Sequence, residues 1–342
     1  MINTIAYITG GTGHLGRNLI MELLEKEDVF VVAMVLKNDN HRDFGKLNER
    51  IFFIDGDTSN PKSIDEFLSA KSDIKARRVL YHVAGKISIM KKNDPSVFKV
   101  NVDGTKNMLD GAIRHRIDKF IYISSVDAIN KPSKPNKVVE EERFSPEKIE
   151  GVYGQSKAIA SNLVLDYASK GLDVTIVQPT AIMGPNDAFG GPINTAIRKY
   201  LNHQLKVVVK GGYDIVDVRD VAKGMILAST KGKNGKCYIL SGTGVTILEL
   251  LDVAHQVSGV KKTKATIPRF IVKMVSPLLE LHARLHHKKP LFTGFSMDCL
   301  NKNSNYSCER AKKDLGYQPR PLKETMQDTI DWMYKEGLAK KS

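Results

Sequence analysis

The first 180 residues alternate between short apolar runs and longer stretches with apolar residues at helical spacing. Strands are predicted over 4–10, 29–36, 50–57, 76–85, 119–126 and 173–180, and helices over 16–26, 61–70, 101–115 and 153–169. The strand runs are nearly continuously apolar, which is typical of a parallel sheet buried on both faces. The pattern therefore predicts an α/β fold with a doubly wound parallel sheet.

The pattern of alternating strands and helices changes after the Gly- and Pro-rich stretch 183–192. Shorter elements follow, and an amphipathic helix is predicted near the C-terminus, within 315–337. The stretch 266–285 is either an amphipathic helical cover over a substrate or ordinary core packing. These features predict a second, smaller part of the chain, partly interleaved with the first.

Composition is that of an ordinary globular protein, with 342 residues, 42% hydrophobic and 26% charged. Cys237, Cys299 and Cys308 show neither metal-binding spacing nor a secreted disulfide framework, which favours a reducing cytoplasm. The N-terminus has no basic region of a signal peptide, and no apolar run has membrane-spanning length. We therefore expect a soluble, cytoplasmic protein without a membrane span.

The net charge of +14 raises the possibility of a nucleic-acid or anionic-membrane partner. The densest basic stretches, 259–264 and 286–290, lack the interleaved aromatic residues of a single-strand binder. The excess charge is better explained as a solvated surface, part of which serves an anionic cofactor. No nucleic-acid partner is expected.

A glycine-rich loop separates the first predicted strand from the first predicted helix. Its spacing satisfies Gly-x-Gly-x-x-Gly and a wider variant, through Gly10, Gly11, Gly13 and Gly16. Glycines at a strand-to-helix turn let backbone N–H groups and the helix N-terminus approach a pyrophosphate. We predict that residues 1–180 form an NAD(P)-binding Rossmann domain. Residues 181–342 would mainly form a substrate-binding part, with segments that return to the first domain.

The end of the second strand bears on the choice between NADP and NAD. An acidic residue there favours NAD, and a basic residue favours the 2′-phosphate of NADP. Lys37 stands near this position, Arg42 follows, and the first acidic residue is Asp39. The sequence favours NADP as the cofactor, with NAD as the alternative.

Tyr153 and Lys157 lie four residues apart on a predicted helix, so their side chains share one face. A free tyrosine has a pKa of about 10, and a nearby ammonium stabilises the phenolate. Such a phenol is predicted to have a lowered pKa and to exchange a proton with a substrate oxygen. Because the pair also occurs by chance, its meaning depends on the residues around it.

The ordered motifs resemble the extended short-chain dehydrogenases/reductases, a resemblance that covers nearly the whole chain. They are TGGTGHLG (9–16), GD (56–57), HVAG (82–85), NVDGT (101–105), YISSVDA (122–128), Tyr153-x-x-x-Lys157 and QPTAIMGP (178–185). Within this family the chain is most similar to dihydroflavonol 4-reductases, cinnamoyl-CoA reductases and 3β-hydroxysteroid dehydrogenases. Bacterial relatives are described as NAD-dependent epimerase/dehydratase proteins.

The resemblance implies a role for each candidate site residue. The catalytic set is Ser125, Tyr153, Lys157 and Asn101, with Ser125 preferred to Ser124 and with helix capping as the alternative role of Asn101. Asp57 would bind the adenine amino group, Lys157 the nicotinamide ribose, and Pro179 would pack beside the nicotinamide. The full cofactor-binding set is Gly10, Gly11, Thr12, Gly13, His14, Leu15, Gly16, Lys37, Asp57, Thr58, Ala84, Gly85, Lys86, Tyr153, Lys157, Pro179 and Thr180.

Three functions are compatible with these residues. The favoured one is hydride transfer between the cofactor and a ketone or secondary alcohol of a bulky, hydrophobic small molecule of steroid, flavonoid or aryl ketone type. A nucleotide-sugar epimerase with tightly bound NAD is the second, whereas Val126–Asp127 replaces the Asp-Glu pair of dehydratases. A non-catalytic redox sensor is the third, although such proteins typically lack the Tyr-x-x-x-Lys pair.

Three further expectations concern histidines, the substrate pocket and assembly. His82 is expected to be structural, and no metal is implied by the histidine pattern. The substrate pocket is expected to be lined by 86–90, 186–195 and 266–285. A homodimer through the helices 101–115 and 153–169 is expected from similar proteins.

Overall fold

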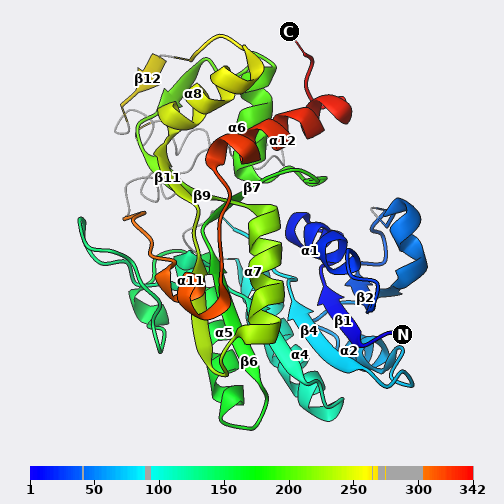
Figure 1. Cartoon of the computed structure of the whole chain (residues 1–342). Helices are drawn as coiled ribbons and strands as arrows, with labels where there is room; N and C mark the ends of the chain where they lie inside the picture. Colours follow the sequence, from blue (N-terminus) through cyan, green and yellow to red (C-terminus); the bar gives the residue numbers. More distant parts are fainter. Residues whose placement is uncertain (41, 89–93, 264, 269–273, 275–302, 342) are drawn as a thin grey trace.

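Seven parallel strands form the centre of the molecule. The computed structural model describes residues 1–40, 42–88, 94–263, 265–268, 274 and 303–341 (Figure 1). The strand order is β10-β6-β5-β4-β1-β2-β3, and every adjacent pair is parallel. The strands are β1 (Thr4–Thr9), β2 (Val29–Val35), β3 (Ile51–Asp55), β4 (Arg77–His82), β5 (Lys119–Ile123), β6 (Val174–Pro179) and β10 (Lys236–Leu240). The predicted doubly wound α/β fold is confirmed.

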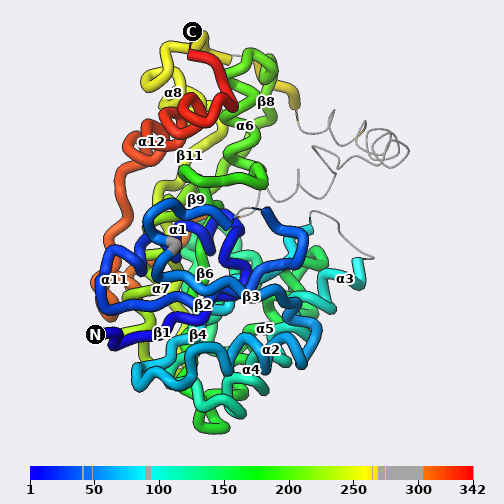
Figure 2. The backbone as a smooth tube through the Cα atoms, turned by 90° about the vertical axis from the view of Figure 1, so that its right-hand side faces the viewer, coloured from blue at the N-terminus to red at the C-terminus, as the bar shows by residue number. Residues whose placement is uncertain are grey.

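Helices cover both faces of this sheet, because successive strand side chains point to opposite sides. Ile5 and Tyr7 pack toward one helical layer, and Ala6 and Ile8 toward the other. The first layer contains α2 (Pro61–Ser69), α4 (Gly104–Arg114) and α5 (Val152–Ala168). The second contains α1 (His14–Leu24), α7 (Val218–Lys231) and α11 (Glu309–Leu315) (Figures 1 and 2).

The helix predicted over 101–115 begins earlier than its motif suggested. It starts with α3 (Pro95–Phe98), passes through one π turn, η2 (Lys99–Asp103), and continues as α4. Short 3₁₀ turns are η1 (Gly45–Arg50), η3 (Val126–Ala128) and η4 (Pro146–Lys148). Asn101 therefore lies inside a continuous helix, on the widened turn.

The second part of the chain has its own small sheets and core. Strands β7 (Ala181–Met183), β9 (Gly212–Asp217) and β11 (Thr243–Thr246) form one sheet, and β8 (Val207–Val209) pairs with β12 (Ala265–Ile267). Helices α6 (Pro192–Leu201), α8 (Ile247–Ser258) and α12 (Leu322–Lys335) pack around them. Both α7–β10 and α11 return to the large sheet (Figure 1), as interleaving requires. Most of the predicted cover over 266–285 lies outside the described residues.

A buried ion network fastens the second part to α7. Asp217 caps α7 by accepting the N–H of Arg219, whose guanidinium also contacts Asp217 at 2.7 Å. Arg320, just before α12, donates to Asp220 at 2.9 Å, and Arg219 reaches Asp328 on α12 at 2.7 Å. Because breaking a buried pair leaves a charge uncompensated, the Arg320–Asp220 pair ties the segment before α12 to the first turn of α7.

Two expectations about the whole chain can be compared with the described residues. None of the helices within the described ranges is both long and apolar enough to cross a membrane. Cys237 and Cys308 are free, buried thiols, and burial raises the pKa of Cys237 to about 12. Cys299 lies outside the described residues.

Candidate active site

The predicted site residues meet at the carboxyl edge of the large sheet. β1 and β4 are neighbours, but the chain proceeds from them in opposite directions, which opens a crevice at this edge. The glycine loop follows β1, Gly85 follows β4, Ser125 follows β5 and Pro179 ends β6. The topology therefore places the candidate cofactor loop and the candidate catalytic groups on one side of the sheet.

The glycine loop is closely packed and has room only for glycine. Gly10 has φ +68°, and a Cβ there would lie 3.1 Å from the Ala84 Cα. A Cβ on Gly16 would lie 2.1 Å from the Gly10 carbonyl oxygen. The N-cap residue of α1, Gly13, provides no side-chain cap, so N–H groups of the first turn from His14 onward are available to an anion. The loop fits a dinucleotide pyrophosphate.

Beside this loop, the ends of β2 and β3 carry both acidic and basic groups. The Thr12 hydroxyl donates a short hydrogen bond to Asp39. Arg42 donates to the Asp39 carbonyl at 2.9 Å and to the Leu36 carbonyl at 3.1 Å, and it pairs with Asp55. Lys37 is exposed at the end of β2. Arg42 and Asp39 therefore both lie where the protein would contact the 2′ position of the cofactor's adenosine ribose.

Asp57 and Thr58 follow β3 in a short turn. The Asp57 carboxylate is exposed and accepts the Ser59 N–H at 2.8 Å. Thr58 is buried against the helix, where a Cβ on Gly104 would lie 2.6 Å from its hydroxyl oxygen. Asp57 is thus available to a ligand, whereas Thr58 packs against α4.

The turn after β4 forms the opposite wall. Thr9 accepts the backbone N–H groups of Val83 and Ala84, each at 3.0 Å. A Cβ on Gly85 would lie 3.3 Å from the Lys157 Nζ, so a larger side chain would fill the space above that ammonium. The side chain of Lys86 turns outward and pairs with Asp94 at 3.5 Å.

Buried hydrogen bonds tie this wall to the helix behind it. Because Thr9 Oγ accepts two N–H groups, its own proton goes to His82 Nδ1, at 2.8 Å. His82 Nε2 then donates to Thr105 at 3.0 Å, and Thr105 donates to the Asn101 carbonyl at 2.7 Å. His82 is neutral and structural in this network. Burial lowers its pKa to about 3, and the Lys157 charge acts in the same direction.

We expect His82 to make the protein acid-sensitive. Its pKa is about 3 in the folded protein and about 6.5 in an unfolded chain, so its stabilising contribution is lost as the pH falls below 6.5. Between pH 7.5 and pH 5 this residue lowers the free energy of unfolding by about 2 kcal/mol. Urea unfolding at both pH values should show that the free energy of unfolding falls by about 2 kcal/mol less in His82→Gln than in the wild type. The exposed His203→Gln is the control, and equal falls in wild type and His82→Gln would contradict the assignment.

Tyr153, Lys157 and Ser125 come together below the glycine loop. Tyr153 and Lys157 lie one turn apart on α5, and the Lys157 ammonium donates to the Ile123 carbonyl at 2.8 Å. The same ammonium lies 4.8 Å from the centroid of the Tyr122 ring. A hydrogen bond joins the Tyr153 and Ser125 side chains. The three residues thus form one cluster at the ends of β5 and α5.

The ionisation of this cluster differs from the sequence prediction. Burial raises the pKa of the Tyr153 phenol, the Asp127 charge raises it further, and the hydrogen bond to Ser125 opposes them. Burial lowers the pKa of Lys157 to about 7. The predicted lowering of the phenol pKa is therefore wrong for the protein alone, because burial and the Asp127 charge outweigh the hydrogen bond to Ser125. At neutral pH the phenol is protonated.

The two adjacent serines point in different directions. Ser124 is buried and exchanges a hydrogen bond with Ser161 on α5, at 2.8 Å. Ser125 caps the η3 turn by accepting the Asp127 N–H at 3.1 Å, and it also contacts Tyr153. Because Ser125 caps a turn and also contacts Tyr153, the geometry favours Ser125 over Ser124 as the group beside a substrate oxygen.

Asn101 holds the catalytic helix and the β4 turn together rather than capping a helix. Its amide oxygen accepts the Lys86 N–H at 2.7 Å, and its amide nitrogen donates to the Lys86 carbonyl and the Ser156 hydroxyl. Ser156 in turn donates to the Tyr153 carbonyl at 2.7 Å. The capping alternative is wrong because the helix already begins at Pro95.

Pro179 and Thr180 lie at the end of β6, both buried. The Thr180 N–H donates to the Leu240 carbonyl of β10 at 3.2 Å. This bond continues the pairing of β6 with β10 one residue beyond Pro179.

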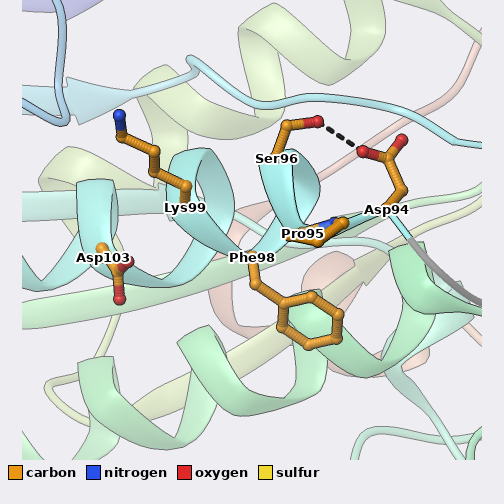
Figure 3. Close-up of a pocket in the computed structure, with 6 residues that line it drawn as sticks. All are labelled: Asp94, Pro95, Ser96, Phe98, Lys99 and Asp103. Atoms are coloured by element: carbon orange, nitrogen blue, oxygen red, sulfur yellow. Dashed lines mark hydrogen bonds between the residues drawn. The ribbon is translucent and has the colours of Figure 1, made fainter.

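Surface hollows among the described residues include one along α3 and η2 and one beside Tyr306. One, of about 740 Å³, lies along α3 and η2 and is lined by Asp94, Pro95, Ser96, Phe98, Lys99 and Asp103 (Figure 3). No predicted site residue lines it. The other, of about 750 Å³, lies between β9, β11 and residues 303–306, and Tyr306 lines it. The described parts of the predicted pocket segments 86–90 and 186–195 line neither hollow.

Sequence reasoning missed Lys131 and Tyr306. The Lys131 ammonium pairs with Asp127 at 2.9 Å and lies 5.6 Å from the centroid of the Tyr306 ring. Tyr306 lies more than a hundred residues after Lys131 in the sequence, and no motif predicts the contact between them. Within the described ranges, no group of three or more His, Cys, Asp or Glu side chains has metal-binding geometry.

Comparisons with known proteins agree with this architecture. The family model described as "NAD dependent epimerase/dehydratase family" matches residues 6–240. Sterol demethylase protein B of Methylococcus capsulatus is 29% identical over 335 residues, which cover 97% of this chain and 98% of the relative. A putative dihydroflavonol 4-reductase of Synechocystis sp. is 28% identical over 338 residues, covering 98% and 96%. The crystal structure of gox2253 has a TM-score of 0.83 and 29% identity, covering 99% of this chain and 100% of that one.

Proposed function

The chain belongs to the NAD dependent epimerase/dehydratase family, within the extended short-chain dehydrogenases/reductases, and we propose that it is an NAD(P)-dependent oxidoreductase acting on a ketone or secondary alcohol. The observation that carries the proposal is the cluster of Tyr153, Ser125 and Lys157 beside a glycine-lined crevice. When bound, the nicotinamide supplies or accepts the hydride.

The chain's own residues would handle the proton. Tyr153 donates it to the substrate oxygen, and Ser125 donates a second hydrogen bond to the same oxygen. Lys157, whose pKa of about 7 reflects its burial, would regain its full charge on contact with cofactor hydroxyl groups. Because the phenol is protonated at neutral pH, Tyr153 carries the proton that carbonyl reduction requires.

A bulky, hydrophobic substrate is the best match to the relatives. One relative is described as a sterol demethylase protein and another as a putative dihydroflavonol 4-reductase, and each aligns with nearly the whole chain. The hollow beside Tyr306, of about 750 Å³, has the capacity for a molecule of this size. We propose a steroid, flavonoid or aryl ketone as the substrate type.

We propose NADP(H) as the preferred cofactor, with Arg42 as its 2′-phosphate ligand and Lys37 beside it. Arg42 is held at the end of β2 by the Leu36 carbonyl, and a 2′-phosphate would replace Asp55 as its anionic partner. Asp39, which accepts the Thr12 hydroxyl, is the group that would instead take a ribose diol. NAD(H) is therefore the alternative outcome.

Arg42→Ala tests the cofactor choice. We expect its Kd for NADP⁺ to rise at least tenfold, because one charge-assisted contact to phosphate is lost, while its Kd for NAD⁺ stays within about twofold. Isothermal titration calorimetry measures both, with Arg50→Ala as the control, since the Arg50 guanidinium donates to the carbonyls of Leu24 and Lys26 at the end of α1 opposite the glycine loop. Tighter binding of NAD⁺ than NADP⁺ by the wild type would overturn the preference.

The proposed reaction is tested with NADPH or NADH and a panel of 3-ketosteroids, dihydroflavonols and aryl ketones. We expect loss of the reduced-nicotinamide absorbance at 340 nm with at least one of them and formation of the matching alcohol. Cofactor that stays bound without net consumption, together with interconversion of a nucleotide sugar, would indicate an epimerase. Binding without any redox chemistry would indicate a sensor.

We also propose a homodimer through the α4 and α5 side of the molecule. These helices pack against each other, and Ile113 of α4 exposes 43% of its surface. Light scattering coupled to size-exclusion chromatography would give twice the chain mass for the wild type and a shift toward monomer for Ile113→Glu.

A further inference from the structure

Asp127 and Lys131 form an ion pair beside Tyr153, the candidate acid, and neither residue belongs to the predicted catalytic or cofactor-binding set. Asp127 belongs to the η3 turn that follows Ser125. A Cβ on Gly154 would lie 2.5 Å from the Asp127 carbonyl oxygen, so the first turn of α5 packs directly on η3. Asp127 therefore stands next to Tyr153, and its charge raises the pKa of that phenol.

Lys131 partners this carboxylate from the other side. Its ammonium lies 2.9 Å from Asp127 Oδ1, and only 14% of its side chain is exposed. Burial acts to lower the pKa of Lys131, but Asp127 and Tyr306 raise it above its usual range. Lys131 thus carries its positive charge at every pH at which the protein is folded and working.

The distant segment 303–307 covers the Lys131 side chain. Backbone hydrogen bonds join this segment to Val138. The Val138 N–H donates to the Asn305 carbonyl at 2.8 Å, and the Ser307 N–H donates to the Val138 carbonyl at 2.9 Å. Asn303 donates to the Pro132 carbonyl at 3.0 Å. These bonds fix the Tyr306 ring over the Lys131 ammonium.

We propose that Lys131 is a positioning residue for proton transfer by Tyr153, because it neutralises the Asp127 carboxylate beside that phenol. This inference rests on the proposed function of Tyr153. Without the Lys131 charge, the negative charge of Asp127 would oppose formation of the phenolate, which is the state Tyr153 reaches after it donates its proton. With Lys131 in place, the charge of the Asp127 side chain, which is 52% exposed, is offset by an ammonium at 2.9 Å.

The charged and titratable groups around Tyr153 come from several elements. Among the described residues they are Lys157 on α5, Tyr122 on β5, Asp127 on η3, and Lys131 and Tyr306 beyond them, with Asp214 of β9 acting on Tyr306. Lys157 and Tyr122 stay unchanged in the variants below, so a change in the titration of the phenol is assigned to the Asp127–Lys131 pair.

The test follows the phenol itself and needs no substrate. 3,5-Difluorotyrosine is placed at position 153, and its ¹⁹F signal is titrated in the presence of saturating NADP⁺. We expect the midpoint to rise by about one pH unit in Lys131→Met and to fall by a similar amount in Asp127→Asn. The double variant Asp127→Asn/Lys131→Met and the conservative Lys131→Arg should both titrate close to the parent protein.

The double variant and Lys131→Arg separate this proposal from a merely structural role of Lys131. A midpoint in Lys131→Met equal to that of the parent would overturn it, as would a double variant displaced as far as Lys131→Met. If Lys131→Met fails to fold, a midpoint that falls in Asp127→Asn and is restored by the conservative Asp127→Glu supports the same conclusion, and an unchanged one overturns it. Failure of the proposed oxidoreductase function appears separately, as absent turnover with the ketone panel.

Discussion

Replacing Tyr153 by phenylalanine is expected to lower turnover of a ketone substrate about a thousandfold. The substitution removes the hydroxyl that donates the proton while it keeps the ring, and positioned acid–base groups contribute roughly 10²–10⁴ in rate. Ser125 and the crevice stay in place, so the Kd for NADP⁺ should change by less than about threefold. Single-turnover hydride transfer, followed by nicotinamide absorbance, measures the chemical step directly.

Tyr167→Phe is the matched control for this variant. Tyr167 lies at the far end of the same helix, and its phenol donates to Asp110 rather than to the crevice. We expect it to retain wild-type turnover. Wild-type turnover in a folded Tyr153→Phe sample would remove Tyr153 from the mechanism and with it the proposed function.

The fold was predictable because its signals are local. Each strand of the large sheet from β1 to β6 coincides with an apolar run of the sequence, within two or three residues at either end. A parallel strand buried on both faces leaves a nearly unbroken apolar run, and a glycine loop between a strand and a helix has few alternative conformations. The start of the helix at Pro95 was missed because the π turn interrupts the spacing expected of a regular helix.

The candidate site was only partly predictable, because motifs give residue types but not directions or distant neighbours. The sequence could not separate the direction of Ser124 from that of Ser125, which follows from the contact of Ser124 with Ser161. It also could not give the balance between burial and charge at Tyr153, which depends on the whole shell around the phenol. The contact between Lys131 and Tyr306 joins segments remote in sequence, and such contacts leave no periodic signal.

We expect cofactor binding and proton transfer to depend on one another in this site. The Lys157 ammonium is buried and donates to the Ile123 carbonyl, and this burial is costly for a charged group and lowers its pKa to about 7. Cofactor hydroxyl groups would supply the missing polar partners, so cofactor binding and protonation of Lys157 should be linked. The electrostatics of the phenol are then completed by the ammonium from one side and by the Asp127–Lys131 pair from the other.

The second large effect is expected at the glycine loop, where Gly16→Ala should weaken NADP⁺ binding at least a hundredfold. The new Cβ would lie 2.1 Å from the Gly10 carbonyl oxygen and 2.9 Å from the Gly11 Cα, and both are backbone atoms. The loop must shift away from the first turn of α1, which spoils the anion site formed by its N–H groups. Overpacking of this kind costs about 1–3 kcal/mol, so the thermal midpoint should also fall by several degrees.

Gly244→Ala is the control for this substitution, because a Cβ at Gly244 meets no atom within 4 Å. It should bind NADP⁺ like the wild type and unfold at the same temperature. Gly13→Ala should fall between the two, since its Cβ would lie 3.3 Å from the same Gly10 oxygen. The effects on cofactor affinity should therefore follow the order of these distances. Undiminished NADP⁺ binding by Gly16→Ala would show that the cofactor does not rest on this loop.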